Sequence, residues 1–247
     1  MATPNTMLND WVETIWSTDV SQDTFTEVNE KIYPDAGSSL IFEIDGDNIQ
    51  VWFSFNTSVT SYNWHTSKRY IGVRFRPGSA LSLFSSQLNH AWRETVNLLN
   101  INFAHSSSLL RLLEQLIVLE KHQQIHAVED WLLACVTLDQ HKAKKWNDLL
   151  TKASERLISP YQIAVQSGLT RRTLERNFKK YFGYSPHQLH GLAQIKYARW
   201  QLIKPDSRLS NVALNCGFFD QSHFNHVFKQ HTQETPLEYR QRKLSQI

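Results

Sequence analysis

"GLTRRTLERNFKKYFGYSPHQL", residues 168–189, and "GFFDQSHFNHVFKQHTQETPLEY", residues 217–239, share one skeleton and differ in their polar residues. Up to the glycine the copies align at an offset of 49, which pairs Ala164 with Ala213 and Gly168 with Gly217. Beyond it the offset is 50, which pairs Leu174 with Phe224, Phe178 with Phe228, Lys179 with Lys229 and Pro186 with Pro236. The chain therefore repeats one structural unit, and the second copy carries one inserted residue after its glycine.

Each copy reads as a short helix, a glycine turn, a longer helix and the start of another helix. The small alanine lets two helices approach closely, and the glycine supplies the left-handed conformation that a tight turn between helices often needs. Three helix starts have the form of capping boxes with proline at the first helical position: "SPYQ" at Ser159, "SPHQ" at Ser185 and "TPLE" at Thr235. This pattern predicts a helix-turn-helix that occurs twice.

The helix after the first turn has two distinct faces. Its apolar stripe consists of Leu174, Phe178, Tyr181 and Phe182. Its polar side follows helical spacing and consists of Arg172, Glu175, Arg176 and Lys179. The equivalent polar positions in the second copy are Ser222, Asn225, His226 and Lys229. The shared apolar skeleton predicts the same shape twice, and the altered polar side predicts that each copy reads different bases.

Charge is distributed unevenly along the chain. From Ala143 to the end there are 17 Lys and Arg against 7 Asp and Glu, whereas residues 1–142 hold 9 basic and 16 acidic residues. A basic domain that follows an acidic one indicates a polyanionic partner for the basic part, and nucleic acid is the first candidate.

The first part of the chain has a different character. Residues 25–77 are strand-like, and "SLIFEI" and "IQVWF" flank "DGDN" as a hairpin with one buried face. Two amphipathic helices follow, one with Leu109, Leu112, Leu113 and Leu116, the other with Val128, Trp131, Leu132 and Cys135. "DQHKAKK", residues 139–145, is the expected linker, and a helix of the basic domain opens at Trp146. We expect an α+β, two-domain protein: a mixed β/α domain over residues 1–142, sensor-like or dimerising, and an all-α DNA-binding domain over residues 143–247.

Several classes of protein do not fit the sequence. No apolar run reaches the roughly 18 to 20 residues that span a bilayer, and the N-terminus lacks a signal peptide, so a soluble, cytoplasmic protein without a membrane partner is expected. The two cysteines, Cys135 and Cys216, are expected to be buried free thiols. The chain contains no G-x-S-x-G, H-E-x-x-H, Walker or G-x-G-x-x-G motif, so we expect neither an enzyme nor a cofactor or metal.

Residues 146–240 resemble the DNA-binding domain of the AraC/XylS family of bacterial transcription regulators, in which a long helix joins two helix-turn-helix units. The resemblance is carried by "IAVQSGLTRRTLERNFKKYFGYSPHQL", "IKYARWQLI" and "VALNCGFFDQSHFNHVFKQHTQETPLEYR". In such regulators the early residues of each recognition helix meet base edges in the major groove. The resemblance thus implies base contacts from Arg171, Arg172, Glu175 and Arg176, and from Gln221, Ser222, His223 and His226. Lys179 is expected to contact phosphate, and Asn225 and Lys229 complete the DNA-binding set.

The resemblance also implies partners. Promoter double-stranded DNA and RNA polymerase are expected, activation is the commoner outcome in the family, and a small-molecule effector and a homodimer are left open. "YPDAGSSLIFEIDGD", "GVRFRPGSA" and "AVEDWLLACV" are similar to an uncharacterised domain that precedes AraC-type DNA-binding domains. An alternative from another class is a small-molecule-binding protein, with or without enzymatic activity, whose basic bundle is a surface module. RNA recognition is less favoured, because exposed aromatic platforms are lacking on the recognition faces.

The second unit departs from the first at two positions. Gln233 stands where the first unit has Gly183, so its recognition helix is expected to be less sharply capped. His226 stands where the first unit has Arg176, and a neutral histidine makes fewer charge-assisted contacts, so weaker discrimination between bases is expected from this unit.

Other features allow two interpretations. Arg74 and Arg76 are consistent with an anion site, but a solvated strand face is favoured. His122 and His126 are spaced for a metal pair, but surface histidines are favoured, because no third ligand is evident. Glu175 fits cytosine recognition or an ion pair with Arg171 or Lys179 equally well. The helix over residues 106–121 fits a dimer seam or an intradomain helical hairpin.

Overall fold

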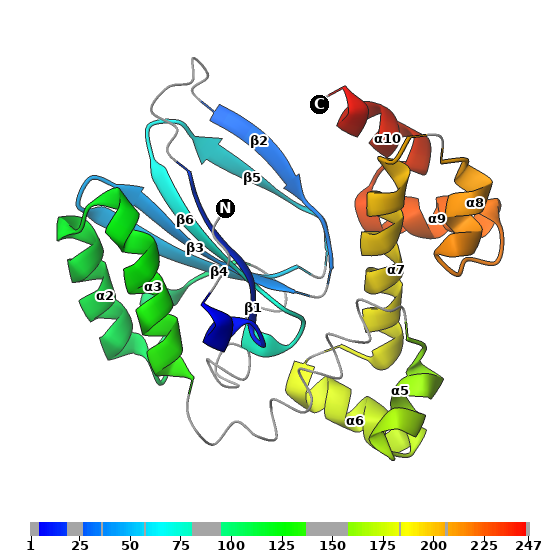
Figure 1. The fold of residues 1–247 in the computed structure, drawn as a ribbon, viewed down its shortest axis with the longest axis horizontal. Coiled ribbons are helices and arrows are strands. Elements are labelled where there is room, and N and C mark those ends of the chain that lie inside the picture. Colours follow the sequence, from blue (N-terminus) through cyan, green and yellow to red (C-terminus); the bar gives the residue numbers. More distant parts are fainter. Residues whose placement is uncertain are drawn as a thin grey trace.

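The computed structural model describes residues 5–18, 27–35, 37–56, 58–80, 95–136, 158–182, 184–205 and 207–245, without the side chains of residues 28 and 180–182. A sheet covered by two helices forms the N-terminal part, and a bundle of helices forms the C-terminal part (Figure 1). The expected α+β, two-domain class is confirmed. The predicted boundary between residues 142 and 143, the linker and the helix from Trp146 lie outside the described residues.

The main sheet is antiparallel in the order β1-β6-β3-β4-β7. Its strands are β1 (Val12–Thr18), β3 (Ser38–Asp45), β4 (Asn48–Phe55), β6 (Arg69–Phe75) and β7 (Val96–Asn97). The predicted hairpin is β3–β4, in which Ile44 pairs with Ile49 around Gly46 at φ 58°. Its alternate side chains Leu40, Phe42, Ile44, Ile49, Val51 and Phe53 are all buried, as predicted. β1 lies outside the predicted strand region, because polar residues interrupt its apolar pattern.

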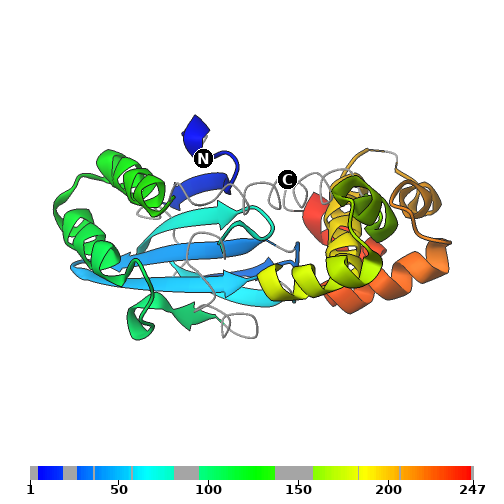
Figure 2. The same ribbon diagram turned by 90° about the horizontal axis from the view of Figure 1, so that it is seen from below.

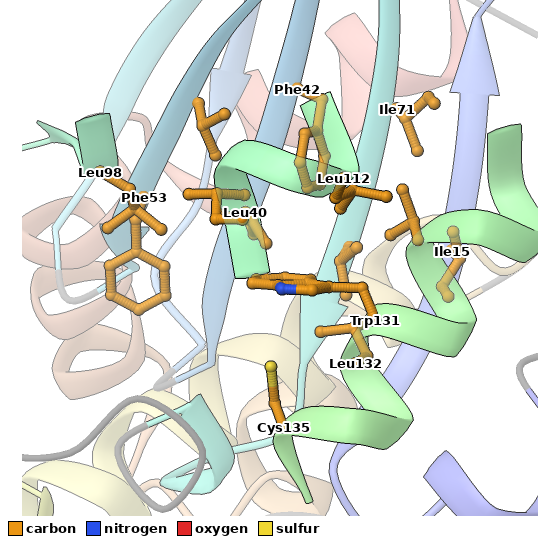
Figure 3. Close-up of a cluster of buried hydrophobic side chains, with 14 of the residues drawn as sticks. Ile15, Leu40, Phe42, Phe53, Ile71, Leu98, Leu112, Trp131, Leu132 and Cys135 are labelled. Carbon is orange, nitrogen blue, oxygen red and sulfur yellow. The ribbon is translucent and has the colours of Figure 1, made fainter. Parts of the chain in front are cut away.

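A second sheet pairs β2 (Glu27–Ile32) with β5 (Thr60–His65). On the main sheet, α2 (Ser106–Val118) and α3 (Lys121–Cys135) cover one face (Figure 2), and short 3-10 helices span Thr6–Leu8 and Leu98–Asn100. The predicted leucines of α2 pack with Trp131 and Leu132 of α3 against the sheet (Figure 3), so the helical hairpin within the domain is the correct interpretation of them. α2 ends at Val118 rather than Lys121, because Glu120 forms a capping box that starts α3.

The C-terminal domain contains α5 (Pro160–Ser167), α6 (Arg171–Phe182), α7 (Pro186–Leu202), α8 (Leu209–Asn215), α9 (Gln221–Thr232) and α10 (Pro236–Leu244). All three predicted capping boxes are present, at Ser159, Ser185 and Thr235. One buried cluster joins α5, α6 and the start of α7, and another joins the end of α7 with α8, α9 and α10. α7 therefore takes part in both helix-turn-helix cores.

The N-terminal domain contacts the C-terminal domain through Tyr33, which follows β2. Tyr33 is 5% exposed and belongs to the cluster of the second unit, where its ring meets the Tyr239 ring edge-on at 5.5 Å. Ion pairs support this contact: Lys31 Nζ lies 2.6 Å from Glu234 Oε1, and Lys196 Nζ lies 2.9 Å from Glu13 Oε1. The position of the second unit is thus tied to the N-terminal domain.

Arg74 of β6 and Arg76, which follows the strand, were expected on a solvated face. The Arg74 side chain is 14% exposed, pairs with Asp35 and donates to Ser39 Oγ at 2.8 Å, because the end of β6 lies beneath the segment after β2. Arg76 Nε donates to the carbonyl oxygen of Asn9 at 2.7 Å. Each arginine has a partner within the protein, and the preferred interpretation, a solvated strand face, is wrong for Arg74.

The histidine and cysteine expectations agree with the structure. The side chains of His122 and His126 are 73% and 78% exposed, so both are surface histidines. Cys135 and Cys216 are buried free thiols, and burial raises the pKa of each to about 12. None of the helices that the structure describes is long and apolar enough to cross a bilayer.

Gln233 closes α9 more sharply than expected. It adopts the left-handed conformation at φ 61°, and its N–H donates to the carbonyl oxygen of Lys229 at 2.8 Å. The helix therefore ends at a defined residue even without glycine, although a left-handed non-glycine residue costs about 1 kcal/mol. Gly183, its counterpart, lies outside the described residues.

Candidate nucleic-acid interface

The first helix-turn-helix unit is fixed by local hydrogen bonds. Gly168 turns the chain at φ 67°, and its N–H donates to the carbonyl oxygen of Val165 at 3.2 Å. Thr170 then caps α6, because its Oγ1 accepts from the N–H of Thr173 at 3.3 Å. Leu174 and Phe178 are 1% and 0% exposed, so the apolar side of α6 is directed into the core. Its opposite side is left for a partner.

The residues expected to bind DNA in the first unit all lie on that exposed side: Arg171, Arg172, Glu175, Arg176 and Lys179. Arg171 Nε lies 3.1 Å from Glu175 Oε1, and their side chains are 91% and 52% exposed. An exposed pair of this spacing stabilises a helix by only about 0.3–0.5 kcal/mol, so contacts to DNA can replace it. The ion pair is the interaction that the structure shows for Glu175, and its contact with cytosine stays a prediction.

The second unit has the same local design. Gly217 turns the chain at φ 77°, and the N–H of Phe218 donates to the carbonyl oxygen of Ala213 at 3.0 Å, just as Leu169 donates to Ala164 at 3.1 Å. Asp220 caps α9, because its Oδ1 accepts from the N–H of His223 at 2.7 Å. Asp220 is therefore the counterpart of Thr170.

The residues expected to read DNA in the second unit are mostly exposed: Gln221, Ser222, His223, His226 and Lys229. Asn225 is half-buried rather than fully exposed, since it lies at the border between the two faces of α9. Its buried Oδ1 has no hydrogen-bond partner among the described residues. His223 Nδ1 accepts from the N–H of Phe219 at 3.4 Å, which places the ring proton of neutral His223 on Nε2. That Nε2–H is the donor left for a base or phosphate.

α7 sets the spacing of the two units. Its 17 residues extend about 25 Å, and α6 and α9 lie at its two ends (Figure 1). In Figure 1 both recognition helices run toward the N-terminal domain, so their first residues lie at the helix ends directed away from it. The N-terminal ends of both helices, where the expected base-reading residues lie, are thus available on one side of the molecule.

Comparison with known families agrees with this geometry. Residues 163–242 match the family described as "Helix-turn-helix domain", and residues 1–97 match a "Domain of unknown function (DUF6597)". The C-terminal domain is therefore of the AraC type that the sequence indicated. The AraC-type match covers both helix-turn-helix units and the helix that joins them.

Some similar proteins match only the C-terminal domain, and others match most of the chain. "HTH-type transcriptional activator RhaS" of Klebsiella pneumoniae (strain 342) is 31% identical over 80 residues, which is 32% of this chain and 29% of RhaS. A Chromobacterium violaceum regulator with an AraC-type DNA-binding domain is 29% identical with a TM-score of 0.36, over 40% of this chain and 95% of that structure. ToxT of Vibrio cholerae O395 is 13% identical with a TM-score of 0.43, over 92% and 96% of the two chains. The match to RhaS spans less than a third of its length.

Sequence reasoning missed two features near the AraC-type domain. Phe219, immediately before the Asp220 cap, has an 87% exposed side chain, although the one-residue insertion that contains it was visible in the repeat. The other feature is a cavity of about 540 Å³ lined by residues of both domains, among them Trp16, Trp64 and Arg199. No sequence pattern marks this cavity, because its walls come from strands and a helix that are far apart in the chain.

The cavity wall combines aromatic rings, an arginine and two residues with buried polar atoms. Thr18 Oγ1 and Trp64 Nε1 are buried and have no hydrogen-bond partner among the described residues. The Trp16 and Trp64 rings meet edge-on at 5.3 Å, which makes part of the wall aromatic. Arg199, also on the wall, lies over the Tyr33 ring at 4.1 Å. Aromatic rings beside a guanidinium group are a wall that suits a small polar molecule.

Proposed function

We propose that the protein is a sequence-specific regulator of transcription that activates its target promoters. The observation that carries the proposal is the pair of helix-turn-helix units with the same hydrogen-bonded turns, the same buried stripes and different exposed polar residues. Each unit places one recognition helix, α6 or α9, in a major groove of double-stranded DNA. Two successive grooves are read by one chain, which then contacts RNA polymerase.

The proposed division of labour follows the chemistry of the side chains. Arg171, Arg172, Glu175 and Arg176 read bases in one half-site, and Gln221, Ser222, His223, Asn225 and His226 read bases in the other. Lys179 and Lys229 occupy equivalent positions one turn further along, where an ammonium group suits phosphate. Arginine grips guanine O6 and N7 with two hydrogen bonds, which neutral histidine cannot do, so α6 discriminates more strongly than α9.

Activation has support from the name of the RhaS relatives, which are transcriptional activators. Because promoter DNA lies in the bacterial cytoplasm, the proposed function implies a cytoplasmic protein. It needs no catalytic group and no metal. A homodimer remains compatible with the proposal, because Leu110, Ile117 and Val118 expose apolar surface on α2.

Binding of the full-length protein to a random pool of double-stranded DNA, followed by sequencing of the bound fraction, tests the proposal. We expect one enriched sequence in two parts, and gel shifts in which double-stranded DNA binds far more tightly than RNA or an unrelated duplex. Equal binding to all duplexes, or preference for RNA, would refute it.

A matched pair of variants assigns the two half-sites. Arg176→Ala and His226→Ala change equivalent positions of α6 and α9, so each should relax selection in a different half of the enriched sequence. Gln241→Ala, an exposed change on α10, should alter neither half. If both variants relax the same half, the assignment of the units is wrong.

We further propose that the cavity between the domains holds a small-molecule effector. Its volume of about 540 Å³ lies in the ordinary range of ligand sites, and its wall combines the Trp16 and Trp64 rings with the Arg199 side chain. A ligand that stabilises the protein in thermal melts should lose its effect in Thr18→Val and Trp64→Phe. Trp52→Phe, which changes a tryptophan that does not line the cavity, should keep it. Retention of the effect in both cavity variants would place the ligand elsewhere, and a broad screen without any stabilising compound would count against the effector.

A further inference from the structure

The inserted residue of the second helix-turn-helix unit can be identified from hydrogen bonds. Phe218 and Leu169 donate to the equivalent carbonyl oxygens of Ala213 and Ala164, so they correspond at the offset of 49. Asp220 and Thr170 cap their helices through the same type of bond, so they correspond at the offset of 50. The residue without a counterpart in the first unit is therefore Phe219.

Phe219 is presented to the surrounding solvent by a rigid frame. Its side chain is 87% exposed, the largest fraction among the large hydrophobic residues that the structure describes. On one side Phe218 is buried against Phe224, with ring centroids 5.0 Å apart, and on the other side Asp220 holds the first turn of α9. The backbone N–H of Phe219 itself donates to His223 Nδ1. Because these contacts hold the backbone in place, the Phe219 ring stays exposed and does not pack in the hydrophobic core.

The position of Phe219 relates it to DNA under the proposed function. It lies two residues before Gln221, at the end of α9 that carries the residues expected to read bases. A phenyl ring has neither charge nor donor, so it offers little to a phosphate group, and the apolar group that a base edge presents in the major groove is the thymine methyl. We propose that Phe219 reads a thymine at the edge of the second half-site by contact with its methyl group.

This proposal rests on the proposed function and predicts a specific chemical sensitivity. Replacement of that thymine by deoxyuridine removes only the methyl group. We expect wild-type affinity to fall about fourfold at this one position, as the loss of one buried methyl group implies. Phe219→Ala should bind the thymine and deoxyuridine sites equally, because the partner of the methyl group is already gone.

The experiment uses the full chain and its selected DNA, with every thymine replaced in turn by deoxyuridine. Phe219→Leu keeps an apolar contact and should retain part of the sensitivity, whereas Leu214→Ala, a change at a 64% exposed apolar residue of α8, should behave as wild type. Thermal melting of each variant tests whether its fold is intact. If the wild-type protein selects no sequence at all, the proposed function itself fails.

Four other outcomes would overturn only the role of Phe219. The first is a selected site without thymine at the edge of the second half-site, and the second is equal sensitivity to deoxyuridine in wild type and Phe219→Ala. The third is a loss of affinity in Phe219→Ala that is the same on all sequences. The fourth is normal DNA binding by Phe219→Ala with loss of transcription activation alone. The third outcome would indicate a contact with the sugar-phosphate backbone, and the fourth a contact with a protein partner.

Discussion

Two substitutions two residues apart on α6 should impair DNA recognition for different reasons. Phe178 is 0% exposed and packs in the cluster that contains Leu174, Leu189 and Leu192. Phe178→Ala should therefore cost about 3–5 kcal/mol of unfolding free energy, a large share of the roughly 5–15 kcal/mol that a domain has. For a domain of this size the loss corresponds to a fall in Tm of about 12 °C or more. Binding should weaken on every sequence.

Arg176→Ala should leave the fold intact, because its exposed side chain lies opposite the buried stripe and surface changes usually stay within about 0.5 kcal/mol. If the guanidinium grips guanine O6 and N7, the loss is about 1–3 kcal/mol of binding energy at one base pair, and specificity relaxes there alone. Arg176→Lys keeps the charge but loses the planar fork, so it should keep the affinity for unrelated DNA and still lose the preference for guanine.

Thermal melting beside binding to a set of single-base operator variants separates the two effects. Early melting of Arg176→Ala, or equal weakening on all operator variants, would show that Arg176 is structural or contacts phosphate. In that case the reading face of α6 has been placed incorrectly. A Phe178→Ala protein that melts normally would contradict the role of its ring in the core.

Four further predictions follow from the same structure. One chain should protect two segments of a non-palindromic site about one helical turn (~34 Å) apart in a footprint, and protection of a single segment would contradict the spacing set by α7. Lys179→Ala should reduce the slope of log affinity against log salt concentration by about 0.9 with an unchanged preferred sequence; a changed preference would make Lys179 a base-reading residue. Burial opposes ionisation of Glu234, but hydrogen bonds from Arg242 and Lys31 outweigh it and hold its pKa below the usual 4.5. Its stabilising effect should be complete above pH 4.5 and disappear as the pH falls through the lowered pKa, so acid unfolding curves of wild type and Glu234→Gln should converge at low pH. Gln233→Gly should raise unfolding free energy by about 1 kcal/mol in denaturant titrations, because it relieves the left-handed backbone, and no gain would mean that the αL cap is unstrained.

The helix-turn-helix units could be predicted from the sequence because their determinants are local. The capping boxes at Ser159, Ser185 and Thr235 and the turns at Gly168 and Gly217 act within a few residues, so the pattern alone indicates the structure. The leucine spacing of α2 and the alternation along β3 and β4 are local in the same sense.

Features that depend on contacts between distant segments could not be predicted. β1 becomes a strand by pairing with β6, despite its broken apolar pattern. The sequence pattern predicts Arg74 on the surface, because only the fold brings Asp35 beside it. Nothing in the sequence around Tyr33 indicates that it contacts the C-terminal domain, and only the fold places it in the core of the second unit. The surface expected to read DNA could be predicted only in part. Helical spacing predicts which residues of α6 and α9 share the polar side, whereas the half-buried state of Asn225 and the exposure of Phe219 depend on how the helices pack.

The contact at Tyr33 gives the proposed effector cavity a route to one unit in particular. Tyr33 lines the cavity and also packs on Tyr239, which in turn meets Phe228 of α9 with ring centroids 5.6 Å apart. A ligand shifts an equilibrium only through contacts that differ between two states. An effector therefore acts on α9 only if it shifts a cavity residue that also contacts the second unit, such as Tyr33, Arg199 or Lys31, and a ligand that contacts none of these would bind without regulating. The second unit is also the one from which we expect weaker discrimination between bases, so we expect an effector to alter the binding of this unit more readily than that of the first.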